Sequence, residues 1–341
     1  MFELTRRLKP VFVCKYGIMQ AITVRQPGGP DVLEWTTVPT PQPGMGEVRL
    51  RVIAAGVNPA DARQREGKYP PPAGASEILG LECSGVVDDV GPGVTRPKIG
   101  DPVVALLAGG GYAEQVVVPA TQCLARRDGV DAVESAGLME AACTVVSNLD
   151  AVHLAPGETV LVHGGAGNVG GFAIQYCKAV GCRVIATAGS LDKLAYCTDR
   201  GADAVIDYHT NWWDAITELT AGRGVDVIMD VVGAPYIRHN VESLARFGRL
   251  ISIGRQQGSQ CLVDFGALQA RQGTITATGL RYRPFDEKAA ICRRVGDVVM
   301  PLVLSGVIRA ARTTRFALTQ AADAHRLLES GTNLGKIVLV V

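Results

Sequence analysis

The stretch "HGGAGNVGG", residues 163–171, decides the fold, because it crowds five glycines between the apolar run "ETVLV" and the apolar helical pattern "FAIQYCKAVG". Gly165, Gly167 and Gly170 form a GxGxxG motif at the expected junction of strand and helix. In this motif the first glycine allows a tight turn, and the second lets the backbone approach a pyrophosphate. The third lets the helix pack closely on the strand. The motif therefore predicts a dinucleotide site.

The helix after the motif supports this prediction. The amides near Asn168 and Val169 would open it, and they would turn the positive end of the helix dipole toward the phosphates. The alternative is a glycine-rich turn that serves packing alone.

From Glu158 onward the sequence alternates apolar strands with amphipathic helices, a rhythm typical of a parallel sheet buried on both faces. We expect a doubly wound Rossmann domain over residues 140–279. Its later elements are a helix over "PYIRHNVESLARFG" (235–248), the strand "RLISIG" (249–254), one further helix, and a sixth strand at "TITATG" (274–279).

The segments on either side have a different pattern. Residues 19–139 hold mostly short β-rich runs separated by Pro and Gly clusters, which predicts an irregular, barrel-like β domain. The tail, residues 280–341, ends in a strand, a helix and a strand, and we expect it to rejoin that first domain with the cofactor cleft between the halves. Residues 1–18 are basic and without a cleavage site, so they are interpreted as an extension, with a targeting role left open.

Composition narrows the function further. A length of 341 residues favours two domains, and 34 Lys and Arg against 33 Asp and Glu leave no charge imbalance for nucleic acid or an anionic membrane. No apolar stretch is long enough to span a bilayer. Nine scattered cysteines without a CxxC pair or a secretory signal predict reduced thiols in a cytoplasmic protein.

The tip of the second crossover indicates which dinucleotide binds. An NAD site usually has an acidic residue there, but "ATAGSLDKL" offers Gly189 and Ser190. A hydroxyl with Lys193 one turn later can hold a 2′-phosphate, which favours NADPH. Alternatively Ser190 is only an N-cap and Lys193 a surface lysine. Asp192 is a mild signal for NADH, although an acid is favourable in any first helical turn.

These motifs, together with "GVNPADARQREGKYPPPAGASEILGLE", "GGGYAEQVVVP" and "NLGKIVL", resemble the medium-chain dehydrogenase/reductase superfamily. Within it the chain is most similar to the zeta-crystallin-like quinone oxidoreductases, closest to the p53-inducible type, from Met19 to Val341. The resemblance implies an α/β fold with a Rossmann domain and a GroES-like catalytic domain.

The resemblance also implies roles for single residues. Asn58 and Tyr69 would line the nicotinamide and substrate cleft, and Thr144 would contact the cofactor. The 2′-phosphate region would be bound by Ser190, Lys193 and Tyr208.

Two segments depart from the pattern of these relatives. After Gly254, the residues Arg255, Gln256 and Gln257 are bulkier than expected. Val231 stands where relatives often have a small hydroxyl residue. Both segments are expected to border the nicotinamide half of the cofactor.

The zinc-dependent alcohol dehydrogenases of this superfamily hold a catalytic metal with cysteine and histidine. This chain has Asn58 where the first cysteine would fall and "GLE", residues 80–82, in place of "GHE". Without thiolate or imidazole the site is not expected to hold Zn²⁺, so the prediction is a metal-free site.

Without a metal, the substrate should accept hydride readily, as a quinone does, with Asn58 and Tyr69 as hydrogen-bond donors. The alternatives are reduction of an activated C=C bond in an enone or enoyl thioester, with Tyr69 as proton donor, and a protein that binds NADPH without catalysis. Tyr69 could also merely pack beside the prolines. Asp61 is interpreted as structural, and Glu140 and the five histidines receive no catalytic role. The exposed edge expected at "TITATG" favours a homodimer.

Overall fold

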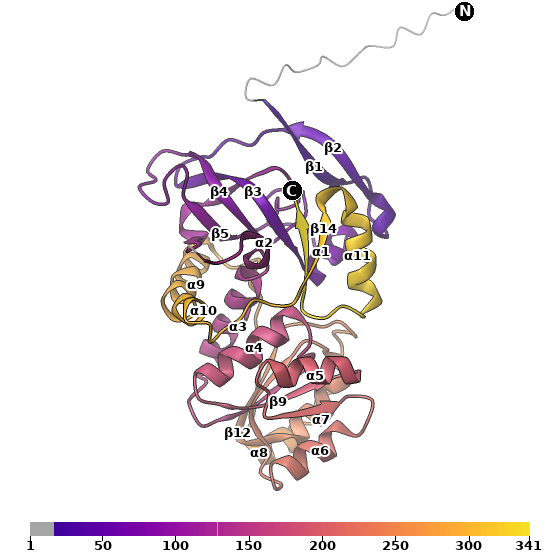
Figure 1. Cartoon of the computed structure of the whole chain (residues 1–341). Coiled ribbons are helices and arrows are strands. Elements are labelled where there is room, and N and C mark those ends of the chain that lie inside the picture. Colours follow the sequence, from indigo (N-terminus) through magenta and orange to yellow (C-terminus); the bar gives the residue numbers. More distant parts are fainter. Residues whose placement is uncertain (1–16, 128) are drawn as a thin grey trace, which may run out of the picture.

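The structure is a computed structural model that describes residues 17–127 and 129–341. Two large sheets form the two ends of the molecule (Figure 1). The chain begins in the upper end of the view, passes through the lower end, and returns to the upper end with its last helix and strands. The predicted mixed α/β fold, with a Rossmann-type sheet and a second β-rich unit, is confirmed.

The lower end is built on a six-stranded parallel sheet with the strand order β10-β9-β8-β11-β12-β13. This is the doubly wound order, in which successive strands are added on both sides of a central pair, β8 and β11. The strands are β8 (Thr159–Val162), β9 (Arg183–Ala188), β10 (Ala204–Asp207), β11 (Val225–Asp230), β12 (Leu244–Ser252) and β13 (Thr274–Ala277).

Helices connect these strands and cover the sheet. The crossovers are α4 (Asn168–Ala179), α5 (Leu191–Asp199), α6 (Trp212–Leu219), α7 (Ile237–Glu242) and α8 (Phe265–Arg271). Helices α3 (Met139–Ala151), α9 (Phe285–Val298) and α10 (Met300–Leu304) lead into and out of this unit.

The upper sheet has seven strands, in the order β14-β15-β3-β4-β5-β7, with β6 also paired to β3. Its strands are β3 (Glu47–Val57), β4 (Glu82–Val90), β5 (Pro102–Leu106), β6 (Gln115–Pro119), β7 (Cys123–Ala125), β14 (Thr313–Ala317) and β15 (Lys336–Val340). A hairpin lies beside it, of β1 (Ile18–Val24) and β2 (Leu33–Pro39). The helices of this half are α1 (Pro59–Arg65), α2 (Ala132–Ser135) and α11 (Ala321–Ser330), with 3₁₀ turns at Pro30–Val32, Ala120–Gln122 and Leu318–Gln320. A further 3₁₀ turn, Ala234–Tyr236, lies between β11 and α7 in the lower end.

The expected return of the tail is seen in the strand pairing. β15 pairs antiparallel with β3, and β14 pairs parallel with β15. The last strand of the chain is therefore a central strand of the first sheet, which places the residues before it beside the cofactor domain.

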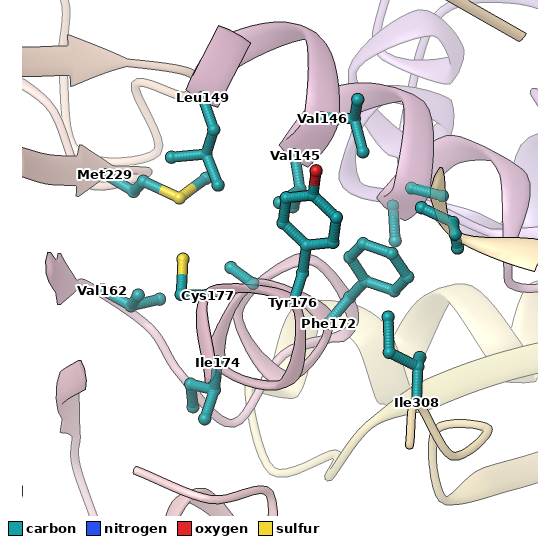
Figure 2. Packing of buried hydrophobic residues seen from close by; sticks show 14 of the residues in the cluster. Val145, Val146, Leu149, Val162, Phe172, Ile174, Tyr176, Cys177, Met229 and Ile308 are labelled. Carbon is teal, nitrogen blue, oxygen red and sulfur yellow. The ribbon is translucent and has the colours of Figure 1, made fainter. Parts of the chain in front are cut away.

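The largest core lies between α3 and α4 (Figure 2). Val145 and Leu149 of α3 meet Phe172 and Tyr176 of α4, and these two rings stack with centroids 6.2 Å apart. Buried residues of β5 and α9 join the same core. One continuous apolar layer therefore ties the two ends of the molecule together, which limits how freely they move against each other.

One predicted helix is wrong at its end. The pattern over residues 235–248 predicted one helix, but α7 stops at Glu242 and β12 begins at Leu244. Leu244 and Ala245 are buried against the sheet, and the strand then kinks at Phe247, whose φ is +63°. The apolar residues 241, 244 and 245 fit a helical face as well as a strand, so periodicity could not separate them.

The predicted extension, residues 1–18, lies largely outside the described residues. Its last residue, Ile18, already belongs to β1, where it pairs with Pro39.

Candidate functional site

Most residues predicted to bind the cofactor lie at one edge of the six-stranded sheet. They follow the carboxyl ends of β8, β9, β10, β11 and β12. In doubly wound sheets the ligand crevice opens at this edge, where the strand order reverses, here between β8 and β11. The fold therefore brings together residues that are up to 90 positions apart in the sequence, from Gly165 to Arg255.

Two glycines of the motif are required by packing. A Cβ at Gly170 would lie 2.3 Å from the carbonyl oxygen of Gly164, and a Cβ at Gly165 would lie 2.8 Å from Cys197 Sγ. Both distances are shorter than any real contact. These two positions let α4 start directly against the turn that ends β8.

Gly167 is different, because packing does not explain it. A Cβ there would meet only the carbonyl oxygen of Gly164, at 3.6 Å, and the residue itself is exposed. Gly167 is the N-cap of α4, so the amides of Asn168 and Val169 open the helix beside it. This bare backbone at a helix N-terminus fits a pyrophosphate.

The predicted 2′-phosphate residues also lie together. Ser190 caps α5 by accepting a hydrogen bond from the Lys193 amide at 3.4 Å, and Lys193 Nζ donates to the carbonyl of Gly331. Tyr208 lies over Gly189, where a Cβ would come within 2.2 Å of its ring and hydroxyl. Ser190 is thus an N-cap, as the simpler interpretation held, but it also stands exposed next to an ammonium and a phenol.

The turn after β8, residues 164–167, is called the glycine turn. A chain of buried polar side chains supports it. His163 Nε2 lies 2.8 Å from Asn240 Oδ1, and His163 Nδ1 lies 3.0 Å from Thr187 Oγ1. Because the Asn240 amide donates to Asp230, its oxygen accepts from His163, which fixes the tautomer with the proton on Nε2. Thr187 Oγ1 in turn accepts from the Gly164 amide at 3.4 Å.

The other end of this chain holds the loop after β11. Asp230 Oδ1 accepts from the amides of Val232 and Gly233, at 2.7 and 3.2 Å, and burial raises the pKa of its carboxyl. Burial likewise lowers the pKa of His163 to about 4, so the imidazole is neutral and the chain stays intact at neutral pH. The polar chain thus ties together the ends of β8, β9 and β11.

The loop after β12 packs on the loop after β11. The amide of Gly254 donates to the carbonyl of Asp230 at 3.2 Å, and a Cβ at Gly254 would lie 2.8 Å from the carbonyl oxygen of Val231. Val231 itself lies against Gly164. Arg255 is exposed at the tip of this paired segment. The two departures from the family pattern are therefore neighbours in space.

The second half of the site is a buried cluster at the end of β3. Asn58 caps α1, and its amide group donates to Glu82 Oε1 at 3.0 Å and to the carbonyl of Gly56 at 3.4 Å. Its oxygen accepts from Lys336 Nζ at 2.7 Å, and Lys336 Nζ lies 2.6 Å from Glu82 Oε1. Glu82 and Lys336 are at most 2 % exposed. Both amide hydrogens of Asn58 are thus already committed within the protein.

Glycines make room for this cluster. A Cβ at Gly56 would lie 2.5 Å from Glu82 Oε1, and a Cβ at Gly137 would lie 2.5 Å from Lys336 Cγ. The ion pair is therefore a packed part of the fold.

Asp61 extends the cluster on the side of α1. Its carboxylate accepts from the amides of Asn58 and Gly80, at 2.8 and 3.0 Å, and from the Tyr112 hydroxyl at 3.2 Å. Burial raises the pKa of Asp61 to about 6. Its contacts are all within the fold, so the predicted structural interpretation of Asp61 agrees with its place here.

Tyr69 lies half-buried in a pair of aromatic rings. Tyr282 meets it edge-on with centroids 5.2 Å apart, and the Arg281 guanidinium lies 5.3 Å from its ring centre. Arg281 also donates to the carbonyls of Tyr69 and Ala108 and to Gln64 Oε1. Burial, with the charge of Glu140, raises the pKa of Tyr69 to about 12, so the phenol keeps its proton.

Thr144 and Glu140 lie on α3, which begins beside the cluster. Thr144 is half-buried, and its carbonyl accepts from Asn148 Nδ2 at 2.7 Å. The Glu140 amide donates to Glu82 Oε2 at 2.9 Å, which ties the start of α3 to the buried ion pair.

Sequence reasoning did not anticipate Lys336, Glu82 or Arg281 as members of the site. A signal existed for two of them, because "GKIVLVV" and "GLECSGVV" each place one charge in an otherwise apolar strand. A charge in a buried strand needs a partner of opposite sign. Nothing in the sequence near residue 281 indicates that this arginine reaches Tyr69.

The turn between α11 and β15 joins the two halves of the site. The amide of Gly335 donates to the carbonyl of Ala166 in the glycine turn at 2.9 Å, and Lys336 follows directly. Gly335 has a φ of +74°, and a Cβ there would lie 2.3 Å from the carbonyl oxygen of Arg312.

Residues 17–127 and 129–341 lack two features. They contain no cluster of three or more His, Cys, Asp or Glu side chains placed to hold a metal ion. Nor is any helix in these ranges long and apolar enough to cross a membrane.

Comparison with known proteins agrees with this architecture. Residues 44–128 match the alcohol dehydrogenase GroES-like domain, and residues 168–294 match the family described as zinc-binding dehydrogenase. A quinone oxidoreductase of Pseudomonas aeruginosa is 35% identical over 92% of this chain and 97% of its own length. A 2-haloacrylate reductase of a Burkholderia species is 29% identical over 95% of this chain and 99% of its own.

Among solved structures, a mycobacterial protein complexed with NADPH is similar with a TM-score of 0.86. It is 34% identical, and the match covers 95% of this chain and all of that one.

Proposed function

The chain belongs to the quinone oxidoreductases of the medium-chain dehydrogenase/reductase superfamily, and on this premise we propose that it transfers hydride from NADPH to a quinone without zinc. Its cofactor is NADPH. The observation that carries the proposal is the pairing of a bare glycine turn with a buried polar cluster whose cation is the Lys336 ammonium.

The cofactor would be held along the crevice edge. Gly167 and the first amides of α4 would receive the pyrophosphate, and Ser190, Lys193 and Tyr208 would surround the 2′-phosphate. When bound, NADPH supplies the hydride. Val231, Gly254 and Arg255 would border its nicotinamide half, and Thr144 would contact it from α3.

The cleft residues orient the substrate. Tyr69 keeps its proton and is fixed by Arg281 and Tyr282, so its phenol can donate a hydrogen bond to a quinone oxygen. Both hydrogens of the Asn58 amide are committed to Glu82 and Gly56, so Asn58 serves as a positioning residue for Lys336. This revises the predicted role of Asn58 as a donor to the substrate.

The chemistry of the cluster supports the proposed zinc independence. Asn58 and Leu81 offer neither thiolate nor imidazole, and the Lys336 ammonium lies between the Asn58 and Glu82 oxygens. A positive charge already occupies the position between these oxygens, so a divalent cation there would be repelled.

Reduction of an activated C=C bond is the second candidate. It is favoured by the likeness to a 2-haloacrylate reductase over nearly the whole chain, and by a cleft that holds protonated groups near the substrate. A protein that binds NADPH without catalysis is the third.

A steady-state assay of NADPH oxidation with 1,2- and 1,4-quinones and with 2-enals separates the three. Quinone-dependent oxidation is the expected result. Oxidation with enals alone would favour the second candidate, and tight binding with no turnover would favour the third.

The Lys193→Ala variant tests the choice of cofactor. Loss of a charge-assisted contact of about 1.5–3 kcal/mol should weaken NADPH binding by roughly 10- to 100-fold and leave NADH binding nearly unchanged. Fluorescence titration of both nucleotides measures this. Lys178→Ala is the control, since Lys178 pairs with Asp203 away from the crevice. Equal losses for both nucleotides would contradict the phosphate assignment.

We further propose a homodimer in the cytoplasm. β13 pairs only with β12 and ends the sheet, so its outer edge is available to a second copy. Sedimentation velocity should give twice the 35.9 kDa chain mass, and a monomer at micromolar concentration would contradict it. The eight cysteines of the described residues are free thiols, which fits a reducing compartment.

A further inference from the structure

Glu140 is placed beside the buried ion pair of Glu82 and Lys336 by a contact of its own backbone. It is the second residue of α3, and its amide is held by Glu82 Oε2 at 2.9 Å. Its side chain is half-buried. Within residues 17–127 and 129–341 no hydrogen bond or ion pair engages its carboxyl, in contrast to the carboxyls of Glu82 and Asp61.

Charged and titratable groups face this carboxyl from every element packed around it. They are Glu82 of β4, Asp61 of α1, Lys336 of β15, Tyr69 of the loop after α1, Arg281 of the loop after β13, Lys288 of α9, and Cys143 on α3 itself.

The two nearest cations are committed elsewhere. Lys336 is shared by Glu82 and Asn58, and Arg281 is shared by two carbonyls and Gln64. Burial and the Glu82 carboxylate therefore outweigh them and raise the pKa of Glu140 to about 8. The carboxyl is protonated at neutral pH, and it lies close enough to Tyr69 for its charge, once ionised, to raise the pKa of the phenol.

We propose that Glu140 is the catalytic acid of this cleft, supplying the proton that completes reduction of the substrate. The inference rests on the function proposed above and adds a residue to it. The substrate gains a hydride and becomes an anion. The O–H bond of the Glu140 carboxyl then breaks as an O–H bond forms on the quinone oxygen, or a C–H bond at the α-carbon of an activated alkene. The resulting carboxylate recovers a proton from water.

Tyr69 is the less suitable acid of the two. A group is most effective when its pKa lies near the working pH, and burial raises the pKa of Tyr69 to about 12. The phenol therefore orients the substrate by a hydrogen bond and the carboxyl moves the proton.

The Glu140→Gln variant keeps the shape of the side chain and removes its acidic proton. We expect kcat to fall by about 100-fold or more with the quinone or 2-enal that the parent reduces, while the dissociation constant for NADPH changes less than twofold. In the parent enzyme kcat should decline above pH 8, as the acid is lost, and this decline should be absent in the variant. Glu140→Asp should recover part of the rate. Glu134→Gln, at an exposed position of the preceding helix α2, is the control and should behave as the parent.

A second measurement needs neither cofactor nor substrate. A carboxyl whose pKa is higher in the folded than in the unfolded state stabilises the fold below about pH 4.5, and this stability is lost as pH rises toward 8. The thermal midpoint of the cofactor-free protein should thus fall between pH 5 and 8, and less steeply in Glu140→Gln. The contribution of Asp61 is present in both proteins and cancels.

The two measurements distinguish a failure of the proposed function from a failure of the proposed role of Glu140. If no quinone and no enal supports NADPH oxidation by the parent, the proposed function fails, whatever the thermal midpoints show. Suppose that the parent is active, but that in Glu140→Gln the thermal midpoint falls with pH as steeply as in the parent and kcat declines above pH 8 as in the parent. The proposed role of Glu140 as the catalytic acid is then overturned. An equal loss of kcat at all pH values with the decline retained would also overturn it, since that pattern indicates a structural role.

Discussion

Replacing Gly170 with alanine is expected to lower the stability of the cofactor domain and to abolish NADPH binding, whereas Gly167→Ala should weaken NADPH binding and leave stability nearly unchanged. At Gly170 the new methyl group would lie 2.3 Å from the Gly164 carbonyl oxygen and 2.7 Å from Gly165 Cα. Both are backbone atoms, so the turn must move away from α4. Overpacking of this kind costs about 3 kcal/mol, which lowers the thermal midpoint by several degrees.

At Gly167 the same methyl group meets nothing closer than 3.6 Å. Its backbone angles, φ −78° and ψ 172°, also suit alanine. Stability should change by no more than about 0.5 kcal/mol. The methyl group would occupy the space left for the pyrophosphate, so NADPH affinity should fall on the order of 100-fold.

Thermal melts of the cofactor-free variants and fluorescence titration with NADPH measure the two effects separately. A Gly167→Ala variant that binds NADPH as the parent does would show that the glycine is not needed by the nucleotide. A Gly170→Ala variant with an unchanged midpoint would show that α4 is not held against the turn.

The second large effect is expected at the buried ion pair. Lys336→Met removes the ammonium and leaves the fully buried Glu82 carboxylate with hydrogen bonds from Asn58 and Glu140 but no opposite charge. Removing one partner of a buried pair costs about 3–5 kcal/mol. Since protonation neutralises the orphaned carboxylate, the loss should be smaller at low pH and grow as pH rises.

The double variant Glu82→Gln with Lys336→Met is the matched control. It removes both charges and keeps one oxygen, which can accept from either the Asn58 amide group or the Glu140 amide but not from both, so it should recover part of the lost stability. Chemical denaturation of the three proteins at pH 5 and pH 8 tests this. A single variant as stable as the parent would mean that the ion pair contributes nothing to the fold.

Local signals in the sequence were sufficient for the cofactor half. The glycine spacing, the alternation of strands and helices, and the hydroxyl at residue 190 each depend on neighbours a few positions away. The strand order then brings Gly189, Tyr208, Val231 and Arg255 to one edge, because all parallel strands end there.

The catalytic half could not be derived in the same way. Asn58, Glu82, Glu140 and Lys336 are separated by up to 278 residues, and their contacts depend on the tail inserting β15 beside β3. The sequence shows which residue types are present there. It does not show that the Asn58 amide is already used, and this contact is why we propose that Asn58 supports Lys336 and does not donate to the substrate.

The bond between Gly335 and Ala166 has a mechanical consequence. The turn that we propose receives the nucleotide is anchored to its own sheet through Thr187 and to the opposite sheet through Gly335, and the next peptide carries Lys336. A loop fastened on two sides cannot follow either half alone. A hinge motion that opens the molecule must therefore either break the hydrogen bond between Gly335 and Ala166 or move the Lys336 ammonium away from Asn58. Entry of the nucleotide and alignment of the substrate are therefore coupled.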